Sequence, residues 1–210
     1  MDHRLTEVIR KRYDRGARRY DLMEALPERW RFAKWRSRQW SKVAGRKILE
    51  VGVGTGKNLT YYPAGSDVTA IDFSEQMLLR AKKKAARLGT KVRLTQMDVQ
   101  KLQFPDNTFD AVAATFVFCS VPDPVLGLRE VERVCKPGGR VVLLEHVLSA
   151  NRVLAWLMNA ANPVMVRMTG ANMNRRTVEN VAASGLVIER VTHLGIVKLI
   201  EAKKRSNAGK

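Results

Sequence analysis

The sequence contains few of the residues that build disulfide frameworks or metal sites. Among its 210 residues there are two cysteines, Cys119 and Cys135, and three scattered histidines. Two cysteines cannot form a disulfide framework and no Cys/His spacing fits a metal site, so we expect reduced thiols, a cytoplasmic location and no bound metal. No run approaches 18 apolar residues and the first residues carry no apolar signal segment, so we expect neither a membrane span nor secretion.

Acidic residues are also scarce relative to basic ones. The chain has 20 Asp and Glu against 38 Lys and Arg, a formal net charge of +18. Residues 1–47 alone hold 15 basic and six acidic residues, together with three of the four tryptophans. This excess predicts an anionic partner, but it does not choose among nucleic acid, an acidic membrane surface and an acidic substrate.

From Lys47 onward, short apolar runs alternate with amphipathic stretches. The apolar runs predict strands at 47–51, 67–71, 91–95, 109–118 and 140–146, and helices are expected at 74–88, after Asp123 and at 174–185. Two further strands, at 186–192 and 195–202, form a closing hairpin. The alternation predicts an α/β fold with a doubly wound, mostly parallel sheet that contains one antiparallel strand.

A glycine-rich loop follows the first expected strand. Gly52, Gly54 and Gly56 lie between this strand and an expected helix, where glycine lets backbone N–H groups approach a ligand closely. The loop is not a dehydrogenase fingerprint, because Lys57 occupies the third glycine position. It is not a phosphate-binding Walker loop either, because Asn58 stands where Ser or Thr is required.

Two aspartates follow the next two strands. Asp72 lies 20 residues after Gly52, at the end of the second strand, where a carboxylate can accept both ribose hydroxyls of a nucleoside. Asp98 follows the third strand, where a carboxylate can accept from an adenine amino group, with Val99 closing over the ring. A single aspartate at a strand end is usually only a cap, but three features on successive strands predict a nucleoside-containing ligand.

Four segments together resemble a known family. They are EVGVGTG (50–56), AIDFS (70–74), MDVQKLQFPDNTFDAVAATFVFCSVPDP (97–124) and LREVERVCKPGGRVVLLE (128–145). Together they resemble the class I S-adenosylmethionine-dependent methyltransferases over about residues 45–147. The likeness is greatest to the bacterial phosphatidylethanolamine N-methyltransferases, which are related to the quinone C-methyltransferases. The family fold is a Rossmann-like seven-stranded sheet whose last strand is antiparallel, in agreement with the expected hairpin.

The resemblance also implies a site for S-adenosylmethionine and its product S-adenosylhomocysteine. Glu50 and the glycine loop would hold the methionine end, Asp72 the ribose, and Asp98 with Val99 the adenine, with Met77 covering the ring. Asn58 and Phe73 would also bind the cofactor. Thr115 and Phe116 would lie beside the transferred methyl group. The family members that methylate nucleic-acid amino groups carry an Asn/Asp-Pro-Pro-aromatic motif at this point, which this chain lacks.

Residues outside the core are expected to bind the methyl acceptor. Residues 1–44 form a basic helical segment, and Tyr13 is expected at the substrate. Its tryptophans, among them Trp35 and Trp40, are interleaved with cations, so the segment can lie in a lipid headgroup layer or pack its tryptophans on the sheet. Residues 45–205 form the methyltransferase domain, with an apolar cover at 150–170 that is interrupted by Pro163.

Three further residues are candidates for acceptor chemistry. A protonated ethanolamine must lose a proton before it can be methylated, and Tyr20 and His146 are the candidate catalytic residues. Arg175 is a candidate for binding a lipid phosphate, although it is equally placed to be a solvated residue at a helix start.

These expectations converge on an enzyme that N-methylates phosphatidylethanolamine, and its mono- and dimethyl forms, towards phosphatidylcholine. It would act at the inner face of the cell membrane as a peripheral protein, with an anionic surface and a phospholipid as partners and no specific nucleic acid. The alternatives are a quinone-ring C-methyltransferase, an RNA methyltransferase suggested by the charge alone, and a catalytically idle cofactor-binding protein.

Overall fold

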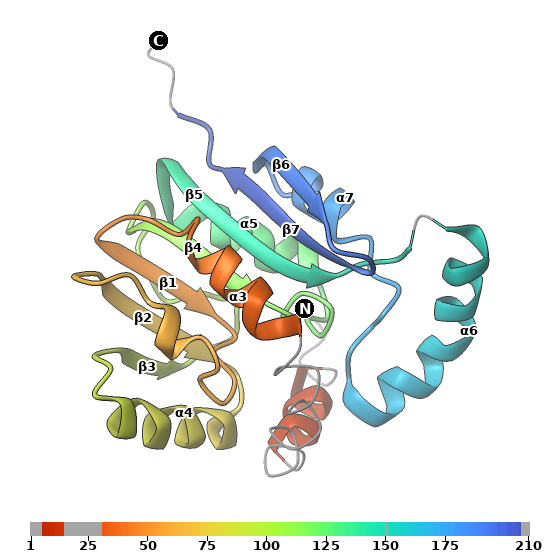
Figure 1. Ribbon diagram of the computed structural model, residues 1–210, viewed down its shortest axis with the longest axis horizontal. Coiled ribbons are helices and arrows are strands. Elements are labelled where there is room, and N and C mark those ends of the chain that lie inside the picture. Colours follow the sequence, from red (N-terminus) through yellow and green to blue (C-terminus); the bar gives the residue numbers. More distant parts are fainter. Residues whose placement is uncertain (1–5, 15–30, 150, 207–210) are drawn as a thin grey trace.

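The protein is built on one seven-stranded sheet. The computed structural model describes residues 6–14, 31–149 and 151–206 (Figure 1). The strands have the order β3-β2-β1-β4-β5-β7-β6. Their bounds are β1 Lys47–Val51, β2 Asp67–Asp72, β3 Arg93–Gln96, β4 Phe109–Thr115, β5 Cys135–His146, β6 Val187–His193 and β7 Val197–Lys203.

The pairing of the strands confirms the expected fold class. β1 lies between β2 and β4 in parallel register, and β3 and β5 extend the sheet in the same direction. β7 is antiparallel to both β5 and β6, so the closing hairpin supplies the single reversed strand. The chain order crosses from one half of the sheet to the other between β3 and β4, and ligands bind at such a crossing in doubly wound folds.

Helices cover both faces of the sheet (Figure 1). Side chains alternate along each strand, so one set packs against α5 (Pro124–Val134) and α7 (Thr177–Ala183). The opposite set packs against α3 (Ala33–Trp40) and α4 (Glu75–Leu88). Helix α4 begins and ends as its sequence predicts: the Ser74 side chain accepts from the Met77 N–H, and Gly89 adopts a left-handed conformation at its end.

Some boundaries differ from the sequence expectation. The fourth strand ends at Thr115 rather than at residue 118, because Phe116 has a φ of 58° and turns the chain out of the sheet. The expected helix after the glycine loop is a single 3₁₀ turn, η2 (Leu59–Tyr61). Strand β5 begins at Cys135, so the Pro-Gly-Gly segment lies within a strand instead of forming a separate stop.

The helix after β5 also differs. α6 (Arg152–Thr169) runs unbroken through Pro163, which was expected to interrupt it. It extends to one side of the sheet (Figure 1). Across the described parts of the chain, no helix is both long enough and apolar enough to span a bilayer.

The N-terminal basic segment is helical where the structure describes it. Residues 6–14 form a helix, and α3 follows after residues 15–30, which lie outside the described residues. Trp40, at the end of α3, is 2% exposed and packs in the core beneath this helix, where it contacts Tyr62. Trp35 packs against the same cluster. Trp40 therefore packs on the sheet and is not available to a lipid headgroup layer. Trp30 lies outside the described residues.

Candidate cofactor and acceptor site

A pocket opens at the carboxyl ends of the parallel strands. Together with the open space at its mouth, the pocket has a volume of about 710 Å³. Its lining combines the ends of β1, β2 and β4 with the N-terminal helix. The lining residues expected from the sequence are Tyr13, Gly52, Gly54, Asp72, Phe73, Met77, Asp98, Val99, Thr115 and Phe116. Chain segments that are far apart in the sequence therefore meet at the predicted place.

The three glycines of the loop have different roles. Gly54 has a φ of +55° and lines the pocket, and a Cβ placed there would meet no atom within 4 Å. Its missing side chain therefore leaves space for a ligand. Gly52 also lines the pocket, but a Cβ there would lie 2.4 Å from Val117 Cγ2. Gly56 is outside the lining, and a Cβ there would lie 2.6 Å from Leu59, so its role is close packing.

Asp72 is held in place by the backbone around it. Its carboxylate accepts from the N–H groups of Gly54 and Ser74, each at 2.9 Å. The side chain is 6% exposed, and burial raises its pKa to about 6, although these hydrogen bonds act in the opposite direction. A carboxylate fixed at the pocket wall is suited to accept hydrogen bonds from a ligand's hydroxyl groups.

Asp98 and its neighbours form the next part of the wall. Asp98 accepts from the backbone N–H and the side-chain amide of Gln100, and Gln100 also accepts from the Asp123 N–H at 3.0 Å. Val99 is 6% exposed and Met77 is 1% exposed. Gln100, which joins the loop after β3 to the start of α5, was not predicted from the sequence.

Beneath the pocket lies a buried polar network centred on Glu50. Glu50 is fully buried and accepts from Asn58 Nδ2 at 2.6 Å and from the Tyr62 hydroxyl. The buried Arg36 side chain donates to Asn58 Oδ1 at 3.0 Å. Burial raises the pKa of Glu50 to about 7, while the Tyr62 and Asn58 hydrogen bonds and the Arg36 charge lower it. Glu50 and Asn58 thus lie below the lining, and their contact with the cofactor stays a prediction.

The network reaches the end of β4 through Thr115. The Thr115 hydroxyl donates to Gln39 Oε1 at 2.7 Å and accepts from Asn58 Nδ2 at 3.0 Å. Gln39 in turn donates to two strand carbonyls, those of Ala114 and Val142. Arg36, Gln39 and Tyr62 were not predicted from the sequence. The three-residue spacing of Arg36 and Gln39 indicates that both lie on one face of α3, although it does not indicate their hydrogen-bond partners.

Phe116 and His146 come together at the ends of β4 and β5. Their rings are stacked with centroids 4.4 Å apart, and the Phe32 ring lies 5.1 Å from that of Phe116. The guanidinium of Arg36 lies over the Phe116 ring, 5.6 Å from its centroid, and makes a cation–π contact with it. His146 is not part of the pocket lining but lies directly behind Phe116, and its catalytic role stays a prediction.

Glu145 points to the opposite face of β5 from His146 and holds the loop after β4. Its Oε1 accepts from the N–H groups of Val117 at 2.9 Å and Phe118 at 3.2 Å. Its Oε2 has no hydrogen-bond partner among the described residues. The side chain is fully buried, and burial raises its pKa to about 7. Glu145 was not predicted from the sequence, because an acidic residue inside an apolar strand gives no indication of which loop it will contact.

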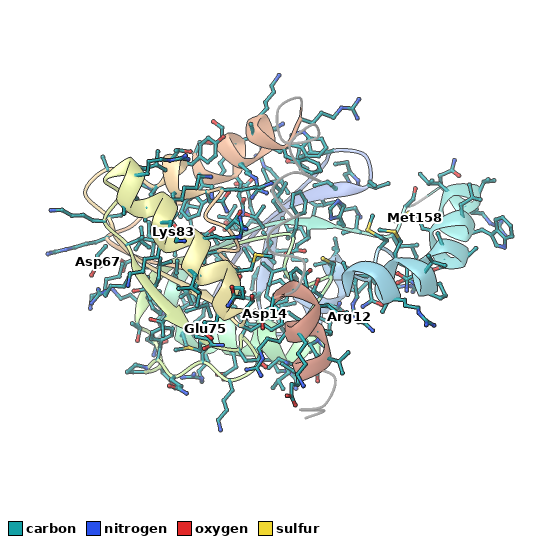
Figure 2. All side chains as sticks on the ribbon, turned by 90° about the horizontal axis from the view of Figure 1, so that it is seen from below. Arg12, Asp14, Asp67, Glu75, Lys83 and Met158 are labelled. Atoms are coloured by element: carbon teal, nitrogen blue, oxygen red, sulfur yellow. The ribbon has the colours of Figure 1, made fainter. Side chains whose placement is uncertain are left out.

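The helix of residues 6–14 closes one side of the pocket. The hydroxyl groups of Tyr13 and Ser120 are hydrogen-bonded at 2.6 Å, and the Tyr13 ring lies edge-on to Phe73 at 5.5 Å. Ser74 donates to Asp14 at 2.5 Å, and Arg12 donates to the Val166 carbonyl at 2.6 Å. Figure 2 shows Asp14 on the side of this helix towards α4 and Arg12 on the side towards α6.

Two other predicted residues are not at the pocket wall. Arg175 donates to the Val121 carbonyl at 2.8 Å, and burial lowers its pKa. Its Nε has no partner in the described part of the chain, and its contact with a phosphate stays a prediction. Tyr20 lies outside the described residues. Residues 151–167 supply nothing to the lining, and the expected apolar cover meets the N-terminal helix at Val166, whose carbonyl accepts from Arg12.

These features fit the cofactor that the motifs predicted. The space at Gly54 and the Asp72 carboxylate, at the carboxyl ends of neighbouring parallel strands, form an adenosine-type site. In the described ranges, no three His, Cys, Asp or Glu side chains gather as metal ligands. Fold and site together define a nucleoside-cofactor methyltransferase.

Comparison with known proteins gives the same class. Residues 49–143 match the methyltransferase domain family. The chain is 34% identical over 170 residues to a demethylmenaquinone methyltransferase of Clavibacter sepedonicus, covering 76% of this chain and 68% of that protein. The chain belongs to the class I S-adenosylmethionine-dependent methyltransferases, and S-adenosylmethionine is its cofactor.

Two further likenesses concern the acceptor and the fold. The chain is 47% identical over 104 residues to a phosphatidylethanolamine N-methyltransferase of Cereibacter sphaeroides, a match that covers 49% of this chain and about half (51%) of that protein. A solved S-adenosylmethionine-dependent methyltransferase of Thermotoga maritima, described as a possible histamine N-methyltransferase, superimposes with a TM-score of 0.74. It covers 94% of this chain and 100% of its own, at 17% identity, and therefore shows the fold alone.

Proposed function

We propose that the protein N-methylates phosphatidylethanolamine and its mono- and dimethyl forms at an anionic membrane surface. The observation that carries the proposal is the aromatic wall at the end of β4. Phe116 lines the pocket, with His146 and Phe32 packed behind it. Each methylation produces an ammonium, and aromatic faces attract ammonium groups. The 47% identity to a phosphatidylethanolamine N-methyltransferase, over 49% of this chain, supports the same acceptor.

When bound, S-adenosylmethionine supplies an electrophilic methyl group carried on sulfur. The protein's own residues then have two tasks, to orient the amine and to keep it unprotonated. His146 lies behind Phe116 and outside the lining, so it is proposed to accept the amine proton through a bridging water. Tyr20 is proposed to assist on the acceptor side. The apolar wall of Val99, Val117 and Val121 disfavours a charged amine before the transfer.

A quinone-ring C-methyltransferase is the second candidate. The demethylmenaquinone methyltransferase is matched over a longer part of the chain, 170 residues against 104. The acceptor of such an enzyme is the reduced quinol, whose aromatic and apolar ring would also fit beside Phe116. It would not, however, produce a cation for these rings to stabilise.

The test uses labelled S-adenosylmethionine and two acceptors in the same detergent micelles, phosphatidylethanolamine and demethylmenaquinone kept reduced as its quinol. We expect label in mono-, di- and trimethylated phosphatidylethanolamine and none in menaquinone when the products are separated by chromatography. Label only in the quinone would overturn the proposal in favour of the second candidate.

Paired histidine variants test the proposed proton acceptor. His146→Asn should lower turnover on phosphatidylethanolamine by about tenfold or more, which is the low end of general-base effects. Affinity for S-adenosylhomocysteine should stay unchanged, because His146 does not line the pocket. His193→Asn, on exposed β6, is the matched control and should behave as wild type. Equal turnover in the two variants would remove His146 from the chemistry.

A further inference from the structure

Helix α6 carries apolar side chains where a surface helix normally carries polar ones. Val153 is 69% exposed, Trp156 67%, Leu157 50% and Val164 60%. Residues 153, 157, 160 and 164 follow the i, i+4, i+7, i+11 spacing of a single helix face, and Trp156 borders it. We call this set, with Ala160, the outer stripe.

The side of α6 that faces the protein is separate from the outer stripe. Met158 is 9% exposed, and Asn162 accepts from the Met173 N–H at 2.9 Å. The Val166 carbonyl accepts from Arg12. Figure 2 shows Met158 on α6 where this helix extends from the body of the protein. The helix is therefore attached by its inner side, and none of the helices and strands that the structure describes covers the outer stripe.

The charges around α6 indicate what covers the outer stripe. From His146 to Val178 the sequence contains four arginines and no acidic residue. Arg152 and Arg167, near the two ends of the helix, are both exposed. An apolar stripe bordered by tryptophan and flanked by cations matches the interface of a bilayer that contains anionic lipid. A second copy fits less well, because a two-fold contact through this face would bring two such arginine sets together with no acid to pair them.

The position of α6 connects this face with the pocket. At the end of the helix, a Cβ on Gly170 would lie 3.4 Å from Ile9 and 3.7 Å from Tyr13, and both of these residues line the pocket. We propose that α6 docks on an anionic bilayer through its outer stripe and so places the mouth of the pocket at the lipid surface. This inference deepens the proposed function and rests on a lipid acceptor.

The test compares one substitution at two sites of similar exposure. Leu157→Glu places a carboxylate on the outer stripe, whereas Leu79→Glu places one on α4, where the leucine is 46% exposed. Full-length proteins are sedimented with vesicles of phosphatidylglycerol and phosphatidylcholine that contain no phosphatidylethanolamine. We expect Leu157→Glu to weaken partitioning by about tenfold or more and Leu79→Glu to leave it within about twofold of wild type.

A second readout locates the docking face. Tryptophan emission of the wild type should shift to shorter wavelength on vesicle binding, and Trp156→Phe should remove most of that shift while retaining sedimentation. Equal effects of the two glutamate variants would overturn the proposal. So would a wild-type dimer in analytical ultracentrifugation that Leu157→Glu dissociates, because the stripe would then be an interface between copies.

The two proposals can fail separately. Vesicle binding is measured without acceptor or cofactor, whereas the methylation test uses detergent micelles. Loss of the docking proposal with methylation of phosphatidylethanolamine in micelles would leave the proposed function standing. Vesicle binding without any methylated phosphatidylethanolamine in micelles would overturn the proposed function and leave the binding of α6 to the bilayer standing.

Discussion

Single residues at the pocket combine backbone constraint with a position in the pocket lining. Gly54 and Asp72 belong to one hydrogen-bonded turn, since the Gly54 N–H donates to the Asp72 carboxylate. Gly54 also has a positive φ, which a residue with a Cβ adopts at a cost of roughly 1–2 kcal/mol. A substitution at Gly54 therefore has two separable effects, one on the backbone and one on the space for the cofactor.

Gly54→Ala should lose cofactor affinity beyond what its backbone cost explains. The new methyl group enters the pocket, so we expect at least about tenfold weaker S-adenosylhomocysteine binding by calorimetry, a loss of ~1.4 kcal/mol. Gly65→Ala is the matched control, because Gly65 also has a positive φ of 75° with no atom within 4 Å of its Cβ position. It should show a similar drop in unfolding free energy with unchanged affinity. Equal affinity in both variants would show that the cofactor does not approach Gly54.

Asp72 should make cofactor binding sensitive to pH. Its pKa of about 6 in the ligand-free protein means that the carboxylate takes up a proton as the pH falls through that value. If ligand hydroxyl groups donate to the carboxylate, affinity for S-adenosylhomocysteine decreases below about pH 6. Asp72→Asn should lose about 1.5–3 kcal/mol of binding free energy at pH 7.5, and its affinity should no longer depend on pH in this range. Asp67→Asn, on the exposed start of the same strand, should retain both. A wild-type pH profile in Asp72→Asn would assign the titration to another group.

At the scale of elements, the N-terminal helix and the loop after β4 depend on each other. The helix of residues 6–14 is joined to that loop by the bond between Tyr13 and Ser120, and Glu145 fixes the same loop from below. The Tyr13–Ser120 bond and the Glu145 side chain therefore both set the position of Phe116 and Val117 at the pocket wall. A change in either anchor should alter the pocket without disrupting the sheet.

Tyr13→Phe removes this bond and keeps the ring against Phe73. We expect S-adenosylhomocysteine affinity to fall by about five- to tenfold, since a hydrogen bond of this type contributes about 1 kcal/mol. Unfolding free energy should change by less, because the bond joins a peripheral helix to a loop. Tyr61→Phe, on η2 and outside the pocket lining, is the control. Unchanged affinity would mean that the N-terminal helix closes the pocket without help from this hydroxyl.

For the whole molecule, three buried carboxyl groups link stability to pH. Burial raises the pKa values of Glu50 and Glu145 to about 7 and that of Asp72 to about 6. Between about pH 4.5 and 7 the folded protein therefore retains protons that the unfolded chain has released. Unfolding free energy contributed by these groups falls as pH rises through this window, by on the order of 1–3 kcal/mol per group.

Glu145→Gln should flatten part of that dependence. In urea titrations at pH 5.5 and 7.5, the wild type should lose stability at the higher pH and the variant should lose less. Glu189→Gln, an exposed residue paired with Lys203, should follow the wild type. A variant slope equal to that of the wild type would show that Glu145 does not titrate in this range.

Local patterns in the sequence were sufficient for the approximate positions of the strands, the ends of α4 and the place of the pocket. Strand ends of a parallel sheet lie at one edge, so Gly54, Asp72 and Asp98 could be placed together from their positions in the chain. Ser74 and Gly89 are capping residues whose effect depends on only a few neighbours.

Only the tertiary structure decided which distant side chains complete the site. Arg36 and Gln39 reach Asn58 and Thr115 across the sheet face, and nothing local in α3 indicates those partners. The apolar residues of α6 could be identified from the sequence, but whether they face the core or solvent depends on how the helix docks after β5. Burial and long-range hydrogen bonds are properties of packed surfaces, so they arise only when the sheet brings these segments together.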